Sequence, residues 1–212
     1  MNKKLSGLYA ITNEKLMPEA VFLDMAEAAL AGGVRVLQYR DKSTNQTKRQ
    51  YQATELKKLC AQYSATFIIN DDIDLAMQVD ADGVHIGKND LSFLNARKKL
   101  STNKIIGVSC YNQISLAREA INSGANYIAF GRFFDSSIKP EAPIANINLI
   151  SKIKKTSNIP LCCIGGITSE NHSPLINAGA DMLAVISDVF SQQSTIDITN
   201  KCKQFLFFRD NM

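Results

Sequence analysis

Two aspartates follow two predicted strands in the stretch between Thr66 and Asp90. Asp71 comes directly after a predicted strand at 67–70, which opens with an apolar run at 67–69, and Asp90 comes shortly after a second run at 83–86. Because parallel strands end at the same edge of a sheet or barrel, we expect the two carboxylates to face each other. Paired carboxylates suit a hard cation such as Mg²⁺, which keeps sites for substrate phosphates. Helix capping is the alternative for each aspartate, but the pair and the nearby basic residues favour a metal.

Polar residues alternate after the predicted strand at 34–39. Gln38, Arg40 and Lys42 lie two positions apart, so an extended chain would place them on one side. Such a cluster of donors suits a phosphate or a diphosphate, although surface charge on a loop is the alternative. Other predicted strand ends carry Asn70, Lys88, Ser109 and Lys139.

A second anion site is predicted at the ends of the last two strands. The run at 160–164 leads into Gly165 and Gly166, and the run at 182–186 leads into Ser187. The loops after strands 7 and 8 commonly bind phosphate in (β/α)8 barrels. Gly166 lets a backbone N–H approach an oxyanion without an intervening Cβ, and the N–H groups around Ile186 and Ser187 can do the same. A plain tight turn is the alternative, but the position favours phosphate.

A regular alternation of apolar runs and amphipathic segments positions these residues. We predict strands at 8–12, 34–39, 67–70, 83–86, 104–110, 127–130, 160–164 and 182–186. We predict helices at 18–31, 46–63, 73–79, 91–100, 114–123, 147–155, 170–178 and 196–208. Eight such units indicate a single (β/α)8 TIM barrel, with residues 1–212 as one catalytic domain. An open doubly wound sheet is the alternative, but no Gly-x-Gly-x-x-Gly follows the first strand.

The composition narrows the class of protein. The 212 residues are 45% hydrophobic and carry a net charge of +4, with basic residues spread along the chain, so we expect no nucleic-acid partner. No apolar run reaches about 18 residues and the N-terminus lacks a signal peptide, so we expect no membrane association. The five cysteines form no metal motif and are interpreted as reduced thiols of a cytoplasmic protein. A homo-oligomer is compatible with the sequence.

The sequence also predicts where the side chains of two adjacent cysteines and of the two histidines lie. Cys162 and Cys163 are adjacent in a predicted strand and should point to opposite faces. His85 lies within a predicted strand and suits a core position and a substrate contact equally well, whereas His172 should be exposed.

Several motifs, taken together and in this order, are highly specific. Over nearly its whole length the chain resembles thiamine-phosphate synthases. The motifs are Tyr9-Ala-Ile-Thr12, Gln38-Tyr-Arg-Asp-Lys42, Ile69-Asn-Asp71, Ala81-Asp-Gly-Val-His-Ile-Gly87, Gly107-Val-Ser-Cys110, Phe130-Gly-Arg-Phe-Phe134, Lys139-Pro140, Ile164-Gly-Gly-Ile-Thr168 and Val185-Ile-Ser187.

The resemblance implies a reaction between two small phosphorylated substrates. In this family, 4-amino-2-methyl-5-(diphosphooxymethyl)pyrimidine is joined to a thiazole phosphate, which releases pyrophosphate and gives thiamine phosphate. The implied mechanism is dissociative: pyrophosphate leaves first, and the thiazole nitrogen captures a pyrimidine-methyl cation. No protein nucleophile is then required.

The resemblance also assigns residues to each ligand. It implies one Mg²⁺ per subunit on Asp71 and Asp90. The residues implied for the pyrimidine diphosphate are Gln38, Tyr39, Arg40, Asp41, Lys42, Asn70, Ser109 and Lys139, and the catalytic residues among them are Arg40, Lys42, Ser109 and Lys139. The residues implied for the thiazole phosphate are Ser136, Ser137, Ile138, Gly166, Ile186 and Ser187.

Two positions depart from the family pattern. Ile138 stands where threonine is frequent, which removes a hydroxyl that Ser136 or Ser137 could replace. Lys88 stands where glutamine is common, and its charge beside Asp90 would either add to the diphosphate site or compete with the metal.

Three other functions are compatible with parts of this pattern. A thiazole tautomerase of the same fold would need neither the paired aspartates nor Lys139. A Schiff-base aldolase would need a buried lysine at a strand end, whereas Lys139 lies in a loop and Lys42 has polar neighbours. A regulatory barrel that binds a phosphorylated ligand without turnover is the non-enzymatic alternative, and the full set of charged residues argues against it.

Overall fold

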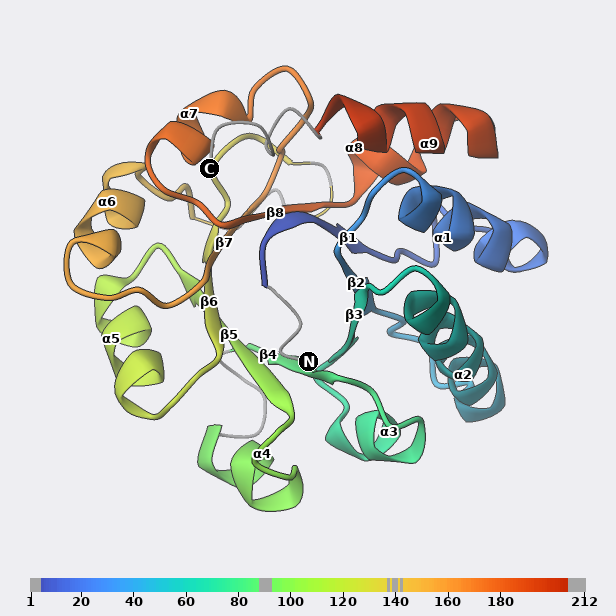
Figure 1. Cartoon of the computed structure of the whole chain (residues 1–212), viewed down its shortest axis with the longest axis horizontal. Helices are drawn as coiled ribbons and strands as arrows, with labels where there is room; N and C mark the ends of the chain where they lie inside the picture. The colour runs from blue at the N-terminus through green and yellow to red at the C-terminus, as the bar shows by residue number, and fades with distance from the viewer. Residues whose placement is uncertain (1–4, 88–92, 137, 139–140, 142, 206–212) are drawn as a thin grey trace.

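Eight parallel strands close into a barrel, and the helices form a ring around it (Figure 1). A computed structural model of the chain describes residues 5–87, 93–136, 138, 141 and 143–205. Neighbouring strands pair in chain order, and β8 closes the ring against β1. The predicted (β/α)8 barrel is therefore confirmed.

The strands lie close to the predicted positions. They are β1 (Gly7–Ile11), β2 (Val36–Tyr39), β3 (Thr66–Asn70), β4 (Gly83–Ile86), β5 (Ile105–Tyr111), β6 (Tyr127–Gly131), β7 (Leu161–Ile164) and β8 (Met182–Val185). The helices are the 3-10 helix η1 (Glu19–Val21), α1 (Phe22–Ala31), α2 (Gln46–Gln62), α3 (Ile73–Gln78), α4 (Phe93–Lys99), α5 (Ile114–Asn122), α6 (Asn148–Lys154), α7 (Ser173–Asn177), α8 (Ser187–Phe190) and α9 (Thr195–Gln204).

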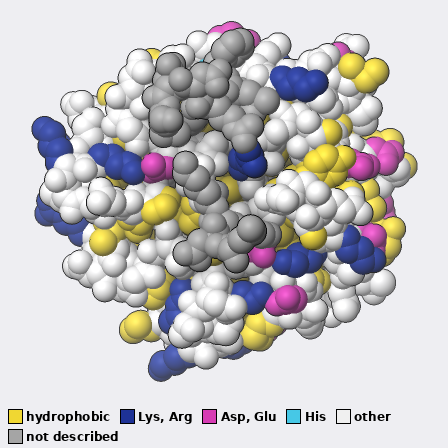
Figure 2. Space-filling model, in the orientation of Figure 1, with side chains coloured by type: hydrophobic (Ala, Val, Ile, Leu, Met, Phe, Trp, Pro, Cys, Tyr) yellow, Lys and Arg dark blue, Asp and Glu magenta, His cyan; other side chains and the backbone are white. Residues whose placement is uncertain are grey.

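Side chains that alternate along the strands form two separate cores. One set fills the barrel interior and includes Tyr9, Tyr127 and Cys162. The other set packs between the strands and the helices and includes Cys163. The two adjacent cysteines thus point to opposite faces, as alternation predicted. Charged side chains are dispersed over the outside, and on the face shown in Figure 2 the Lys and Arg side chains are scattered, with acidic ones among them.

The region after β7 and β8 departs from the predicted pattern. The short helix α8 was not predicted, because it is only four residues long and shows no helical pattern in the sequence. Helix α7 begins at Ser173 rather than 170, because the Asn171 side chain holds a turn: its Oδ1 accepts from Thr168 N, and its Nδ2 donates to Gly166 O. The expectation that His172 is exposed was wrong, since its ring is buried and lies 5.3 Å from that of Phe205.

Polar residues just before β4, β6 and β8 tie neighbouring strands together at the end of the barrel away from the strand carboxyl ends. Asp82 Oδ2 accepts from Phe67 N at 2.7 Å, and Asp181 Oδ2 accepts from Leu161 N at 2.7 Å. Asn126 makes the matching contact with Ile106 N at 2.8 Å. These residues therefore serve the fold rather than the chemistry. None of the described helices is long and apolar enough to cross a membrane.

Replacing Asp181 by alanine is expected to lower the free energy of unfolding by about 2–3 kcal/mol, because the Leu161 N–H loses a charged acceptor. Lys154, whose Nζ lies 2.5 Å from Asp181 Oδ2, also loses its partner. Urea unfolding measures the change, and Asp181→Asn, which keeps an acceptor, should lose less. Equal stability of wild type and Asp181→Ala would contradict this role.

Candidate active site

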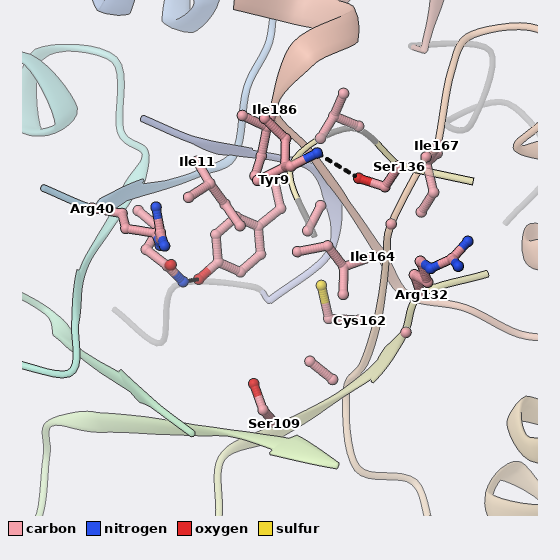
Figure 3. Close-up of a pocket in the computed structure, with 18 of the residues that line it drawn as sticks. Tyr9, Ile11, Arg40, Ser109, Arg132, Ser136, Cys162, Ile164, Ile167 and Ile186 are labelled. Atoms are coloured by element: carbon pink, nitrogen blue, oxygen red, sulfur yellow. Dashed lines mark hydrogen bonds between the residues drawn. The ribbon is translucent and has the colours of Figure 1, made fainter. Parts of the chain in front are cut away.

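A cavity opens at the carboxyl ends of the strands, and its volume is about 1100 Å³ including the open mouth. Residues of β2 to β5 line one side, and the loops after β6, β7 and β8 line the other. In Figure 3, Arg40 and Ser136 lie on opposite sides of the cavity, with Tyr9 between them.

The side formed by β2 to β5 contains four of the residues assigned to the pyrimidine diphosphate. They are Gln38, Arg40, Asn70 and Ser109, and all four line the cavity. Strand pairing sets Gln38 beside Ile68, Asn70 beside His85, and His85 beside Gly107. Because paired residues and residues two positions apart share a face, all four side chains point inward. Among the described residues, none forms an ion pair with the Arg40 guanidinium, which leaves its charge available to an anion.

Tyr39 and Asp41, which the resemblance also assigned to this ligand, do not line the cavity. Alternation turns them toward the helix layer, where the Tyr39 hydroxyl donates to Gln52 Oε1 at 3.0 Å. Burial acts to raise the pKa of Asp41, but hydrogen bonds from Lys48 and Ser43 outweigh it and lower that pKa. The described contacts of both residues are thus structural.

Asp71 and Lys42 meet at the cavity rim. The Lys42 Nζ lies 2.6 Å from Asp71 Oδ2, and the Asn70 Nδ2 donates to the same oxygen at 2.6 Å. Lys42 does not line the cavity itself, and its side chain is 53% exposed. The backbone of Asp71 is left-handed, with φ +61°, which is a backbone conformation that few residue types adopt. The adjacent Asp72 has a structural role, since it caps α3 and pairs with Arg49.

The opposite side of the cavity carries the predicted thiazole phosphate residues. Ser136, Ile138, Gly166, Ile186 and Ser187 all line it. The Ser136 hydroxyl accepts a hydrogen bond from Ile138 N at 3.3 Å, so this serine folds back over its own loop (Figure 3). Ser187 begins α8, and the first N–H groups of a helix have no acceptor within it.

The loop after β7 is held in place from behind. Gly166 has φ +63°, and an added Cβ would lie 2.1 Å from the carbonyl oxygen of Asp135. Asp188 Oδ2 accepts from Ser169 N at 3.1 Å and so joins this loop to α8. Burial raises the pKa of Asp188, while the Ser169 N–H and Lys201 act to lower it. The two halves of the predicted phosphate site are therefore fixed relative to each other.

Replacing Gly166 by alanine is expected to raise the KM for the thiazole phosphate about tenfold or more, and to destabilise the fold by about 1–3 kcal/mol, because the left-handed backbone and the Asp135 carbonyl oppose a Cβ. Steady-state kinetics with each substrate varied in turn measures the first effect. Gly124→Ala is the matched control, since Gly124 has φ +89° with nothing within 4 Å of an added Cβ. A similar KM in both variants would contradict the assignment.

The cavity is also lined by residues that the sequence pattern alone did not assign to a ligand. They include Tyr9, Ile11, His85, Tyr111, Arg132, Cys162, Ile164 and Ala184. Strand alternation was the signal for most of them, because Tyr9 and Ile11 of β1, like Cys162 and Ile164 of β7, lie two positions apart on inward-facing sites. His85, left open between a core position and a substrate contact, faces the cavity.

Four of the predicted residues lie outside the described part of the chain: Lys88, Asp90, Ser137 and Lys139. The pairing of Asp71 with Asp90 therefore stays a prediction. The assignments of Ser137 and Lys139 to the two ligands stay predictions as well.

A closed barrel with a cavity at the carboxyl ends of its strands, into which a few polar side chains point, is the architecture of (β/α)8-barrel enzymes. A protein-family model described as thiamine monophosphate synthase matches residues 8–189. The chain belongs to this family.

Relatives agree with that membership. The chain is 47% identical to the thiamine-phosphate synthase of Alcanivorax borkumensis over 95% of this chain and 93% of that protein. It is 46% identical to the thiamine-phosphate synthase of Acidithiobacillus ferrooxidans over 98% and 95% of the two chains. The solved thiamine phosphate pyrophosphorylase of Pyrococcus furiosus superposes with a TM-score of 0.86 at 31% identity and covers 97% of this chain and 96% of its own.

Proposed function

We propose that this protein is a transferase that joins 4-amino-2-methyl-5-(diphosphooxymethyl)pyrimidine to a thiazole phosphate and releases pyrophosphate. The observation that carries the proposal is a cavity whose two sides carry different groups suited to anions. Arg40 and Asn70 lie on one side, and Gly166 and Ser187 lie on the other. Two phosphorylated substrates can therefore meet across the barrel mouth. A cytoplasmic location is part of this proposal.

The diphosphate is assigned to the side of the cavity that carries more positive charge. Arg40 points into the cavity, and Lys42 stands at the rim with half of its side chain exposed. Negative charge develops on the departing pyrophosphate, and fixed cations stabilise it more than they stabilise the ground state. Lys139 would add a third cation to this side.

One Mg²⁺ on Asp71 and Asp90 completes the proposed site. The Asp71 carboxylate fits such an ion, because it supplies oxygen ligands and is held beside Asn70, which lines the cavity. Within the described residues no cluster of three or more metal-ligating side chains occurs, so the remaining ligands would come from Asp90, substrate oxygens and water. When bound, the ion would neutralise charge on the diphosphate.

The proposed reaction needs no protein nucleophile. The bond between the pyrimidine methylene carbon and the diphosphate oxygen breaks, and its electron pair leaves on the oxygen; the thiazole nitrogen then supplies the pair for the new carbon–nitrogen bond. Cys162 is a thiol on the cavity floor, but burial raises its pKa, so it stays protonated and unreactive. The role of the side chains is to hold the two substrates and stabilise charge.

The direct test is to mix both substrates with Mg²⁺ and measure pyrophosphate. We expect pyrophosphate and thiamine phosphate in equal amounts. Isomerisation of the thiazole without pyrophosphate would point instead to a tautomerase, and binding of both ligands without any turnover would point to a regulatory barrel.

A further inference from the structure

Five polar side chains form a continuous hydrogen-bonded chain across the barrel, and all of them except Tyr127 line the cavity. The Gln38 Nε2 donates to the Tyr9 hydroxyl at 2.6 Å, and the Tyr9 and Tyr127 hydroxyls lie 2.9 Å apart. His85 continues the chain: its Nδ1 lies 2.9 Å from the Tyr127 hydroxyl, and its Nε2 lies 2.8 Å from Ser109 Oγ. Gln38 and Ser109 are the two ends, and Ser109 is labelled in Figure 3.

This series of hydrogen bonds is possible because the residue at its centre is a glycine, which has no side chain. Gly107 lies between His85 and Tyr127 in the register of β4, β5 and β6. An added Cβ at Gly107 would lie 2.0 Å from Tyr127 Cζ, so the ring occupies the space a side chain would need. The Tyr127 ring thereby stacks on His85, with centroids 5.5 Å apart.

The number of protons on each group determines which atom donates in each hydrogen bond of the series. A phenol hydroxyl has one proton to donate, and an amide nitrogen can only donate. Because Gln38 donates to Tyr9, and Tyr9 is fully buried, the Tyr9 proton must go to Tyr127, since buried polar groups are hydrogen-bonded. The Tyr127 proton must then go to His85 Nδ1. Burial raises the pKa of both tyrosines, so both hydroxyls keep their protons.

We infer that Tyr9, Tyr127 and His85 are positioning residues that fix the hydrogen-bonding character of both cavity walls. His85 carries its proton on Nε2 and donates it to Ser109 Oγ. The Ser109 hydroxyl proton is then free to donate into the cavity, while Gln38 presents its Oε1 as an acceptor.

A ligand between the two walls must therefore offer a donor to Gln38 and an acceptor to Ser109. This part of the inference rests on the proposed function, in which an aminopyrimidine diphosphate lies here. Its exocyclic amino group is a donor that matches Gln38 Oε1, and its ring nitrogens or diphosphate oxygens are acceptors that match Ser109. The series of hydrogen bonds thus favours one orientation of the pyrimidine over the other.

The tautomer of His85 tests the inference without reference to activity. With ¹⁵N-labelled histidine at about pH 8, where imidazole is neutral, wild type should show Nε2 protonated and Nδ1 unprotonated. The chain holds only two histidines, and His85→Gln identifies the signals. Gln38→Glu has the same shape but only acceptor oxygens, so it should reverse every donor and move the His85 proton to Nδ1.

Tyr127→Phe removes one hydroxyl and so interrupts the series of hydrogen bonds, while it keeps the ring over Gly107. The two nitrogen signals of His85 should then average, because neither tautomer is held. Tyr63→Phe, which removes an exposed hydroxyl bonded to Glu27, should leave the spectrum unchanged. A wild-type imidazole protonated on Nδ1, or a wild-type tautomer retained in Gln38→Glu or Tyr127→Phe, would overturn the inference.

Kinetics separates this inference from the proposed function. In Tyr127→Phe, kcat/KM for the pyrimidine diphosphate should fall about 10- to 100-fold, with the KM for the thiazole phosphate within about twofold of wild type. Equal losses for the two substrates would contradict a role confined to the pyrimidine side. The expected tautomer in an enzyme that releases no pyrophosphate would remove the proposed function alone, whereas pyrophosphate release with His85 protonated on Nδ1 would remove the inference alone.

Discussion

Replacing Asp71 by asparagine is expected to reduce Mg²⁺-dependent pyrophosphate release about 100- to 1000-fold, because a carboxylate proposed to hold the ion beside the developing charge is lost. Asparagine is the informative substitution, since Asp71 has φ +61° and asparagine tolerates the left-handed region that alanine resists. Asp71→Ala should show the same loss of turnover with an added loss of stability. Steady-state rates over a Mg²⁺ titration measure the effect.

The neighbouring carboxylate supplies the control for Asp71. Asp72 accepts from Leu75 N at the start of α3, and asparagine keeps such a cap while removing the same charge. Asp72→Asn should therefore retain wild-type turnover and Mg²⁺ dependence. Full activity of Asp71→Asn with an unchanged Mg²⁺ titration would remove the metal assignment.

Replacing Arg40 by alanine is expected to lower kcat/KM for the pyrimidine diphosphate about 100- to 1000-fold, because the guanidinium faces the cavity and charged donors stabilise a departing diphosphate. The KM for the thiazole phosphate should stay within about threefold, since that ligand is assigned to the opposite side of the barrel mouth. Kinetics with each substrate varied in turn, together with binding titrations, measures the contrast.

Two further variants sharpen the Arg40 experiment. Arg40→Lys should recover part of the loss, because a lysine keeps the charge but not the bidentate geometry. Arg118→Ala removes an exposed arginine on the outer helix α5 and should leave both substrates unaffected. Equal losses for the two substrates in Arg40→Ala would contradict the two-sided site.

The strand pattern predicted most of the fold. Apolar runs interrupted by glycines and polar residues located all eight strands, and β4 was predicted without error. The region after β8 was missed because α8 is only four residues long, too short to show a helical period. The start of α7 was misplaced because the Asn171 side chain, and not the local helix pattern, decides where that helix begins.

Alternation also explains which site residues were placed well. Gln38 and Arg40 were predicted to share a side, and both face the cavity. Tyr39 and Asp41 alternate with them along the chain, so the same rule sends them to the helix layer, although the whole motif had been assigned to the ligand. Motif resemblance marks a stretch of chain, whereas strand geometry decides which of its side chains reach the substrate.

Local spacing along the chain was enough to predict the eightfold strand–helix repeat, the family and the polar residues at the strand ends. It could not predict that Gln38, Tyr9, Tyr127, His85 and Ser109 form one hydrogen-bonded chain. These residues lie on five different strands, and no local pattern relates them. They meet because the barrel closes and because Gly107 leaves room for the Tyr127 ring at its centre.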